Sequence, residues 1–125
     1  MNEMEKHVDV MKRSLELGKT VMEGFQHTQR LIRDGQFEQA IMMFEESLNG
    51  YAQLEESVRP VMVGLQDNEI EDQLEKVQQV AHLIVDAFRN GDFSKVNEVL
   101  QFTMIPRFKS FMRSIEQTFS KYVLS

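Results

Sequence analysis

Two short stretches decide the fold: RDGQF at residues 33–37 and RNGDF at residues 89–93, fifty-six positions later. Each stretch lies where one long amphipathic pattern ends and the next begins, and each has a glycine at its centre, Gly35 or Gly91. Glycine commonly ends helices because it adopts the left-handed backbone conformation without steric cost. We therefore expect each stretch to form a corner that joins two antiparallel helices.

The segments on both sides of these corners carry apolar residues at alternating spacings of three and four. This is the pattern of an amphipathic helix that buries one face. The pattern extends over four segments, approximately residues 4–32, 37–65, 70–88 and 93–122. A pair formed by Asn2 with Glu5, and another formed by Asn68 with Glu71, have the spacing of helix-capping boxes.

Two prolines lie inside the predicted helices. Pro60 is expected to bend or end the last turn of the second helix, because proline lacks an amide hydrogen and crowds the carbonyl four residues back. The fourth helix begins with Val96, Leu100 and Thr103 in its apolar stripe and is then interrupted by Pro106. Gly18 lies inside the first stripe, where we expect it to allow a neighbouring backbone to approach closely.

The two halves of the chain have similar patterns. Placing one corner on the other aligns residues 17–59 with residues 73–115, and pairs Leu48 with Met104 in the apolar stripe. Ancient duplication and convergence on a favourable corner both explain this likeness. Either way, the pattern predicts two similar helical hairpins.

The segment GQFEQAIMMFEESL, residues 35–48, resembles the corner and second helix of a tetratricopeptide repeat. The two corners of this chain are fifty-six residues apart, whereas that family repeats every 34 residues or so. The tryptophan, leucine and glycine expected earlier in the repeat are also missing. The resemblance therefore implies shared corner chemistry, and it assigns no peptide-binding residues to this chain.

These patterns predict an all-α fold in which residues 1–125 form a single helical-bundle domain. Short connections place consecutive helices antiparallel to one another. We therefore expect an antiparallel up-down-up-down four-helix bundle built from two similar helical hairpins. The three-four spacing predicts crossing angles near 20° between its helices, a value typical of such bundles.

Composition limits the classes of function. The chain has no cysteine, so disulfides, thiolate metal sites and a cysteine nucleophile are excluded. Its longest apolar runs fall short of the roughly 20 residues of a membrane span, so we expect a cytoplasmic protein with no membrane span. The net charge of −6 repels phosphate, and we expect no nucleic-acid partner.

The sequence carries no catalytic motif. A nucleophile elbow, a phosphate-binding glycine loop and a dinucleotide fingerprint are all missing, so we expect a protein that is not an enzyme and has no cofactor. The alternative is a cofactor- or metal-binding helical bundle that uses His27 or His82. The acid-histidine spacings of four differ from the Glu-x-x-His spacing of di-iron bundles, which makes this alternative secondary.

The last helix is the candidate partner-binding element, because its apolar face is wider than one bundle seam buries and basic residues flank it. The candidate residues are Phe102, Ile105, Arg107, Lys109, Met112 and Arg113. The sequence therefore predicts a protein-protein interaction module, or an export-type chaperone that binds an amphipathic helix. Its partner is an unidentified protein or a second copy of the chain, which makes a homodimer one expected form.

Overall fold

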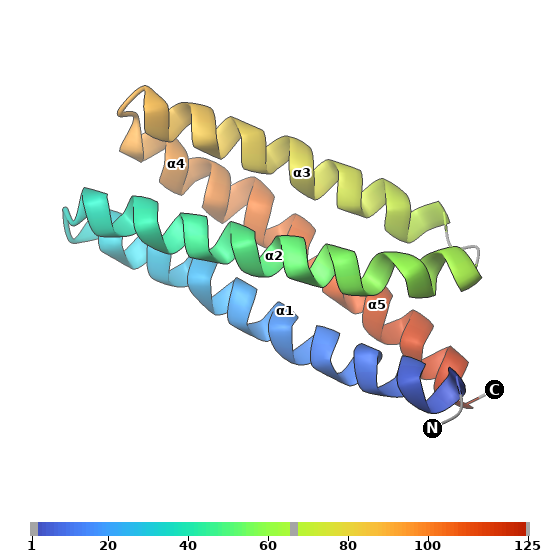
Figure 1. The fold of residues 1–125 in the computed structure, drawn as a ribbon. Helices are drawn as coiled ribbons and strands as arrows, with labels where there is room; N and C mark the ends of the chain where they lie inside the picture. Colours follow the sequence, from blue (N-terminus) through green and yellow to red (C-terminus); the bar gives the residue numbers. More distant parts are fainter. Residues whose placement is uncertain (1–2, 66–67, 125) are drawn as a thin grey trace.

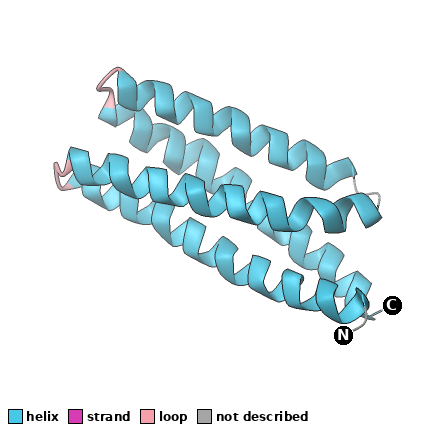
Figure 2. Ribbon diagram, in the orientation of Figure 1, coloured by secondary structure: helices cyan, strands magenta, loops and turns pink. Residues whose placement is uncertain are grey.

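The computed structural model describes residues 3–65 and 68–124, and the side chains of residues 7–62 and 69–121. The described residues are helical apart from the two corners, and they contain no strand (Figure 2). The helices are α1 (Glu3–Arg33), α2 (Phe37–Leu65), α3 (Asn68–Arg89), α4 (Phe93–Val99), η1 (Leu100–Met104) and α5 (Ile105–Leu124). The last three continue one another and form a single fourth rod (Figure 1).

Consecutive rods run in opposite directions, so both corners lie at one end of the bundle (Figure 1). The start of α1 and the end of α5 lie together at the other end (Figure 1). The predicted all-α fold with four helical rods is confirmed, and the course of the rods is consistent with the predicted up-down-up-down order. The capping boxes predicted at Asn2 and Asn68 lie outside the described side chains.

The two corners have the same backbone structure. In the first, the N–H of Gly35 donates to the carbonyl oxygen of Ile32 at 3.0 Å, and the N–H of Gln36 donates to that of Leu31 at 2.8 Å. The equivalent groups of the second corner make the same two bonds at 3.0 and 2.9 Å. Gly35 and Gly91 have φ angles of 75° and 69°. Both corners are therefore Schellman motifs that depend on a left-handed glycine, as the sequence predicts.

The core lies between the four rods and is rich in aromatic side chains. Phe25 of α1 contacts Phe44 of α2 and Phe108 of α5, with ring centroids 6.0 and 5.5 Å apart. Tyr51 of α2 contacts Phe108 and Phe111, each at 6.2 Å. These contacts join both hairpins into one core, and aromatic pairs of this kind add about 0.5 to 1.5 kcal/mol each beyond their buried area.

The fourth rod contains one turn of π-helix, η1, immediately before Pro106. There the N–H of Ile105 donates to the carbonyl oxygen of Leu100, five residues back rather than four. The predicted interruption at Pro106 is thus a change in hydrogen bonding, and the rod continues beyond it. Pro60 does not end α2, which continues to Leu65, the predicted extent of the second helix.

Because of the π turn, the residues of the fourth rod that face the core differ from those that the sequence predicts. Four buried residues are spaced by four, namely Val96, Leu100, Met104 and Phe108. In an α-helix each such step turns the side chain about 40° away from the core, and the wider π turn removes this drift. Met104 is fully buried and takes the core position that the sequence predicts for Thr103, which is half-buried.

The same turn adds one residue to the second hairpin. Equivalent buried positions are fifty-six residues apart before η1 and fifty-seven apart after it. The pairs are Ala40–Val96 and Phe44–Leu100 before η1, and Tyr51–Phe108, Leu54–Phe111 and Val58–Ile115 after it. Leu48 is therefore equivalent to Ile105, and the predicted pairing of Leu48 with Met104 is wrong by one position.

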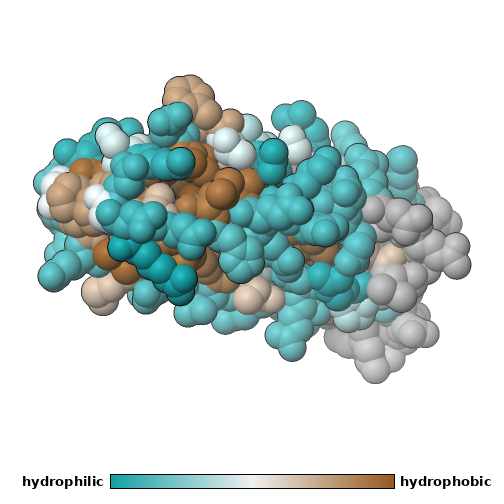
Figure 3. Space-filling view, turned by 90° about the horizontal axis from the view of Figure 1, so that it is seen from above, coloured by the Kyte–Doolittle hydropathy of each residue, from teal (hydrophilic) through white to brown (hydrophobic). Residues whose placement is uncertain are grey.

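Among the described side chains, the large apolar ones that are exposed belong to the half of the bundle nearest the corners. They are Phe37, Met42, Leu83 and Phe102, with exposed fractions of 40%, 63%, 53% and 75%. On the face seen from above, brown apolar atoms gather in this half, whereas hydrophilic atoms cover most of the middle of the molecule (Figure 3). Within residues 3–65 and 68–124, no helix is long and apolar enough to cross a membrane.

Candidate functional site

A groove of about 520 Å³ runs between α1 and α5. Its floor consists of four residues without charge: Leu15, Gly18, Met22 and Met112. Its rim consists of five charged residues: Lys19 and Glu23 from α1, and Lys109, Arg113 and Glu116 from α5. The floor and rim residues are spaced three or four apart on each helix, so each helix turns one continuous stripe toward the groove.

The floor depends on contact between Gly18 and Met112. A Cβ atom at Gly18 would lie 2.1 Å from Cε of Met112 and 2.5 Å from its Sδ. A side chain at residue 18 would therefore displace the Met112 thioether from its position across α1. The sequence predicts a neighbouring backbone at Gly18, but the structure places the Met112 side chain there, so the predicted neighbour is wrong. Methionine has three rotatable bonds, so this part of the floor can change shape at low cost.

The rim charges lack partners within the described part of the molecule. None of the five side chains makes an ion pair or a hydrogen bond there. Three of them are cations and two are anions. Because unpaired exposed charges lose little solvation when an opposite charge approaches, they can guide the orientation of a partner more than they add to its affinity.

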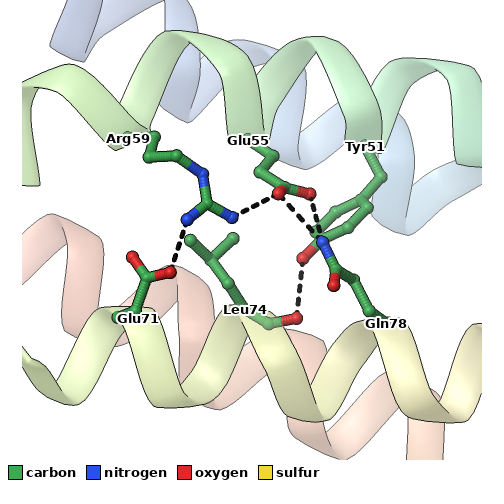
Figure 4. Close-up of polar contacts among 6 residues, drawn as sticks. All are labelled: Tyr51, Glu55, Arg59, Glu71, Leu74 and Gln78. Carbon is green, nitrogen blue, oxygen red and sulfur yellow. Dashed lines mark hydrogen bonds and ion pairs between the residues drawn. The ribbon is translucent and has the colours of Figure 1, made fainter.

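Polar contacts bridge α2 and α3 along the seam between these two helices, which we call the α2–α3 groove (Figure 4). The Glu55 carboxylate accepts hydrogen bonds from the Gln78 amide at 2.8 and 2.9 Å and forms an ion pair with Arg59. Arg59 also donates to Glu71 across the groove. These hydrogen bonds, to Glu55 first and Glu71 second, raise the pKa of the Arg59 guanidinium. The guanidinium therefore keeps its charge and bridges the two helices.

Tyr51 lies beneath this cluster. Its hydroxyl donates to the carbonyl oxygen of Leu74 at 3.2 Å, and the residue is 4% exposed (Figure 4). Burial, followed by the negative charge of Glu55, raises the pKa of the Tyr51 hydroxyl above its ordinary value. The neutral hydroxyl is thus a structural donor that fixes α2 against α3.

The two grooves occupy equivalent places in the internal repeat. Each residue of α3 in Figure 4 is equivalent to the residue of α1 that lies fifty-six positions earlier. Each residue of α2 is equivalent to the residue of α5 that lies fifty-seven positions later. The equivalent pairs are Tyr51–Phe108, Glu55–Met112, Arg59–Glu116, Glu71–Leu15, Leu74–Gly18 and Gln78–Met22. Three polar residues that bridge α2 and α3 thus correspond to apolar residues in the α1–α5 groove. Polar contacts within the chain join the helices of the α2–α3 groove, whereas the α1–α5 groove has an apolar floor and a rim without ion pairs among the described residues.

The structure separates the six residues that the sequence places in a partner-binding surface. Lys109, Met112 and Arg113 line the α1–α5 groove together. Phe102 is 75% exposed on η1, outside the groove lining. Arg107 faces the depression between α3 and α5, beside Gln73 and Lys76.

Ile105 is only 8% exposed and belongs to the core, so it is not part of any binding surface. The sequence places it at the edge of the apolar stripe because an uninterrupted α-helix would point it there. The π turn of η1 rotates it inward, next to the buried Met104.

The α1 side of the groove is missing from the sequence prediction. The apolar stripe of residues 4–32 includes Leu15, Gly18 and Met22 and predicts that all three face the core, yet Leu15 and Met22 are half-buried. A signal was present, because the glycine between them cannot fill a core position with its own side chain. That gap indicates that another residue, Met112, covers this part of α1.

The two histidines of the alternative hypothesis lie on different helices. His27 is half-buried on α1, and His82 is exposed on α3. Within the described residues, no three histidine or acidic side chains come together as a metal site would require.

Comparison with known proteins identifies a family. Neither the curated proteins nor the solved structures contain a match to this chain. One family, described as Domain of unknown function (DUF8042), matches residues 9–114, which include both corners, the π turn and most of the α1–α5 groove. On this match over most of its length, the chain belongs to the DUF8042 family.

Proposed function

We propose that this protein is a non-enzymatic protein-protein interaction module whose α1–α5 groove binds an amphipathic helix. One observation carries the proposal. The α1–α5 groove is apolar at its floor and carries unpaired charges at its rim, whereas hydrogen bonds and ion pairs bridge the helices of the equivalent α2–α3 groove.

The physical basis is helix-in-groove recognition. An amphipathic helix presents apolar side chains at spacings of three, four and seven, which matches a groove formed between two parallel or antiparallel helices. Leu15, Met22 and Met112 supply the apolar contact, and the two methionines allow the floor to adapt to side chains of different shape. Rim charges then select the partner's orientation.

An export-type chaperone that masks an amphipathic helix of its client is one form of this function. The proposal includes a cytoplasmic location. It needs no cofactor, because the groove acts only by covering apolar surface.

The test is capture of partners from a native extract with two charge-matched variants. The groove variant Lys109→Glu/Arg113→Glu reverses two rim cations. The control variant Lys95→Glu/Arg107→Glu reverses two exposed cations of the same rod that lie outside the groove lining. Both variants change the net charge equally, so nonspecific electrostatic effects cancel between them.

We expect quantitative mass spectrometry to show a partner that wild type and control retain and that the groove variant loses by about tenfold or more. Thermal unfolding of each variant checks that the bundle is intact. Equal loss in both variants, or retention by both, contradicts binding through the α1–α5 groove.

A further inference from the structure

The groove-facing stripe of α5 is itself part of an amphipathic helix. Its charges are complementary to those of the same stripe on a second α5 helix that runs in the opposite direction. Lys109, Met112, Arg113 and Glu116 follow one another at spacings of three, one and three. The stripe therefore has a cation at one end, an anion at the other, and Met112 with Arg113 at its centre.

We infer that the helix bound at the α1–α5 groove is α5 of a second copy of this chain, so that the protein forms a twofold-symmetric homodimer. This inference rests on the proposed function, for which it names the partner. In an antiparallel pairing centred between Met112 and Arg113, Lys109 of each copy faces Glu116 of the other. A twofold axis produces this pair twice.

The same charges specify the direction of pairing. A parallel arrangement of two α5 helices would place Lys109 opposite Lys109 and Glu116 opposite Glu116, and like charges in contact are repulsive. The antiparallel arrangement turns both contacts into attractions. At its centre the aliphatic stem of Arg113 covers Met112 of the second copy, which suits a side chain with an apolar stem and a charged end.

No competing contact inside the molecule holds these groups. Within the described residues, Lys109 and Glu116 make no ion pair or hydrogen bond of their own. Glu116 is equivalent to Arg59 of the other groove, and Arg59 is held by two carboxylates from its own chain. The rim charges of the α1–α5 groove are therefore free to pair with a second copy, whereas Arg59 of the other groove is already paired within its own chain.

The size of the face limits how much surface two copies can bury, and small interfaces are typically weak and reversible. Helix α5 has 20 residues, about 30 Å at 1.5 Å per residue, and two adjacent helices span roughly 20 Å. The face covers roughly 600 Å² per copy, at the lower limit for specific interfaces. We therefore expect a reversible dimer with a dissociation constant on the order of 10 µM.

The test is sedimentation equilibrium of the full chain from about 1 to about 500 µM, a range that brackets that affinity. Wild type should change from monomer to dimer over this range. Lys109→Glu and Glu116→Lys should each weaken the dimer by about tenfold or more, because each places two pairs of like charges in contact. The double variant Lys109→Glu/Glu116→Lys exchanges the charges and should restore the affinity to within about threefold of wild type.

The control is Lys95→Glu/Glu98→Lys, which exchanges two exposed charges of α4 outside the groove and should leave the dimer unchanged. A monomer at every concentration, or a double variant as weak as the single ones, overturns the inference. Another outcome is a monomeric wild type that still captures a different protein, which the groove variant of the capture experiment loses. In that case the proposed function stands and only this inference fails. A monomeric wild type that also captures no protein contradicts both.

Discussion

Phe37 and Phe93, which occupy the same place in the two halves of the chain, stack face to face with ring centroids 4.0 Å apart and ring planes 6° from parallel. Two equivalent residues can contact each other in this way only on the axis that relates the halves. The stack therefore places a pseudo-twofold axis through the corner end of the bundle. It also fixes the two corners side by side, although fifty-six residues separate them in the sequence.

Replacing Phe37 with alanine should lower the free energy of unfolding by about 1 to 2 kcal/mol. The ring is 40% exposed, so most of this loss comes from the stack and not from complete burial. The measurement is urea denaturation followed by circular dichroism. Phe102→Ala is the control, because that ring is 75% exposed and contacts no other ring in the described residues, and its effect should stay within about 0.5 kcal/mol. Equal effects of both substitutions would contradict a structural role for the stack.

The corners and the four rods could be predicted from the sequence because their causes are local. A glycine between two amphipathic patterns specifies a Schellman corner through bonds that span only five residues, such as Gln36 to Leu31. The stripe spacing then determines which face each helix buries. The Phe37–Phe93 stack has no local signal, because it depends on how the two hairpins associate.

The elevated pKa of Tyr51 predicts a loss of stability in alkaline solution. An unfolded tyrosine ionises near pH 10, whereas the folded Tyr51 hydroxyl stays protonated above that pH because burial raises its pKa. Above about pH 10 the unfolded state therefore binds fewer protons than the folded state, so the free energy of unfolding falls as pH rises. The contribution of one such group reaches at most about 1.4 kcal/mol per pH unit.

The measurement is chemical denaturation of wild type and Tyr51→Phe between about pH 8 and pH 12, on both sides of the tyrosine pKa. At the lower end the variant should be less stable by about 1 kcal/mol, because it loses the hydrogen bond to Leu74. Its stability should fall less steeply above pH 10, so the two curves converge. Parallel curves would show that Tyr51 does not titrate differently in the two states.

The buried Ser14 hydroxyl is expected to destabilise the core, so a substitution that removes it should increase the free energy of unfolding. It is 1% exposed, and its hydroxyl has no hydrogen-bond partner in the described residues. The equivalent residue of the second hairpin is Ile70, which is apolar and equally buried. Ser14→Ala should therefore raise the free energy of unfolding by about 1 kcal/mol, because it removes an unsatisfied polar group and favours the helix.

Ser47→Ala is the matched control for this substitution. The Ser47 hydroxyl is also buried, but it donates to the carbonyl oxygen of Met43 at 2.8 Å. Its removal should therefore give no comparable gain in a thermal or urea denaturation experiment. A destabilised Ser14→Ala protein would mean that the hydroxyl has a partner, such as a buried water.

Only half of the groove could be predicted from the sequence. Lys109, Met112 and Arg113 stand out because they follow one another on a helix with surplus apolar surface. Their partners on α1 depend on the antiparallel packing of the first and last rods, which no local pattern specifies. The equivalence of the two grooves was also hidden, because the π turn shifts every residue after η1 by one position.

Deleting Phe102 should test the role of the π turn directly. The deletion removes the extra residue of the second hairpin, so buried residues after Leu100 adopt the spacing found in α2, which already contains Pro60 within a continuous helix. We expect a folded protein with unchanged helical circular dichroism and a cost below about 3 kcal/mol, the usual penalty of proline in an α-helix. Deleting the exposed Ser110 removes the same number of residues but rotates the rest of α5 by about 100° out of the core. That variant should lose more than about 5 kcal/mol and fail to fold cooperatively. If both deletions unfold the protein equally, η1 is not the single inserted residue that separates the two hairpins.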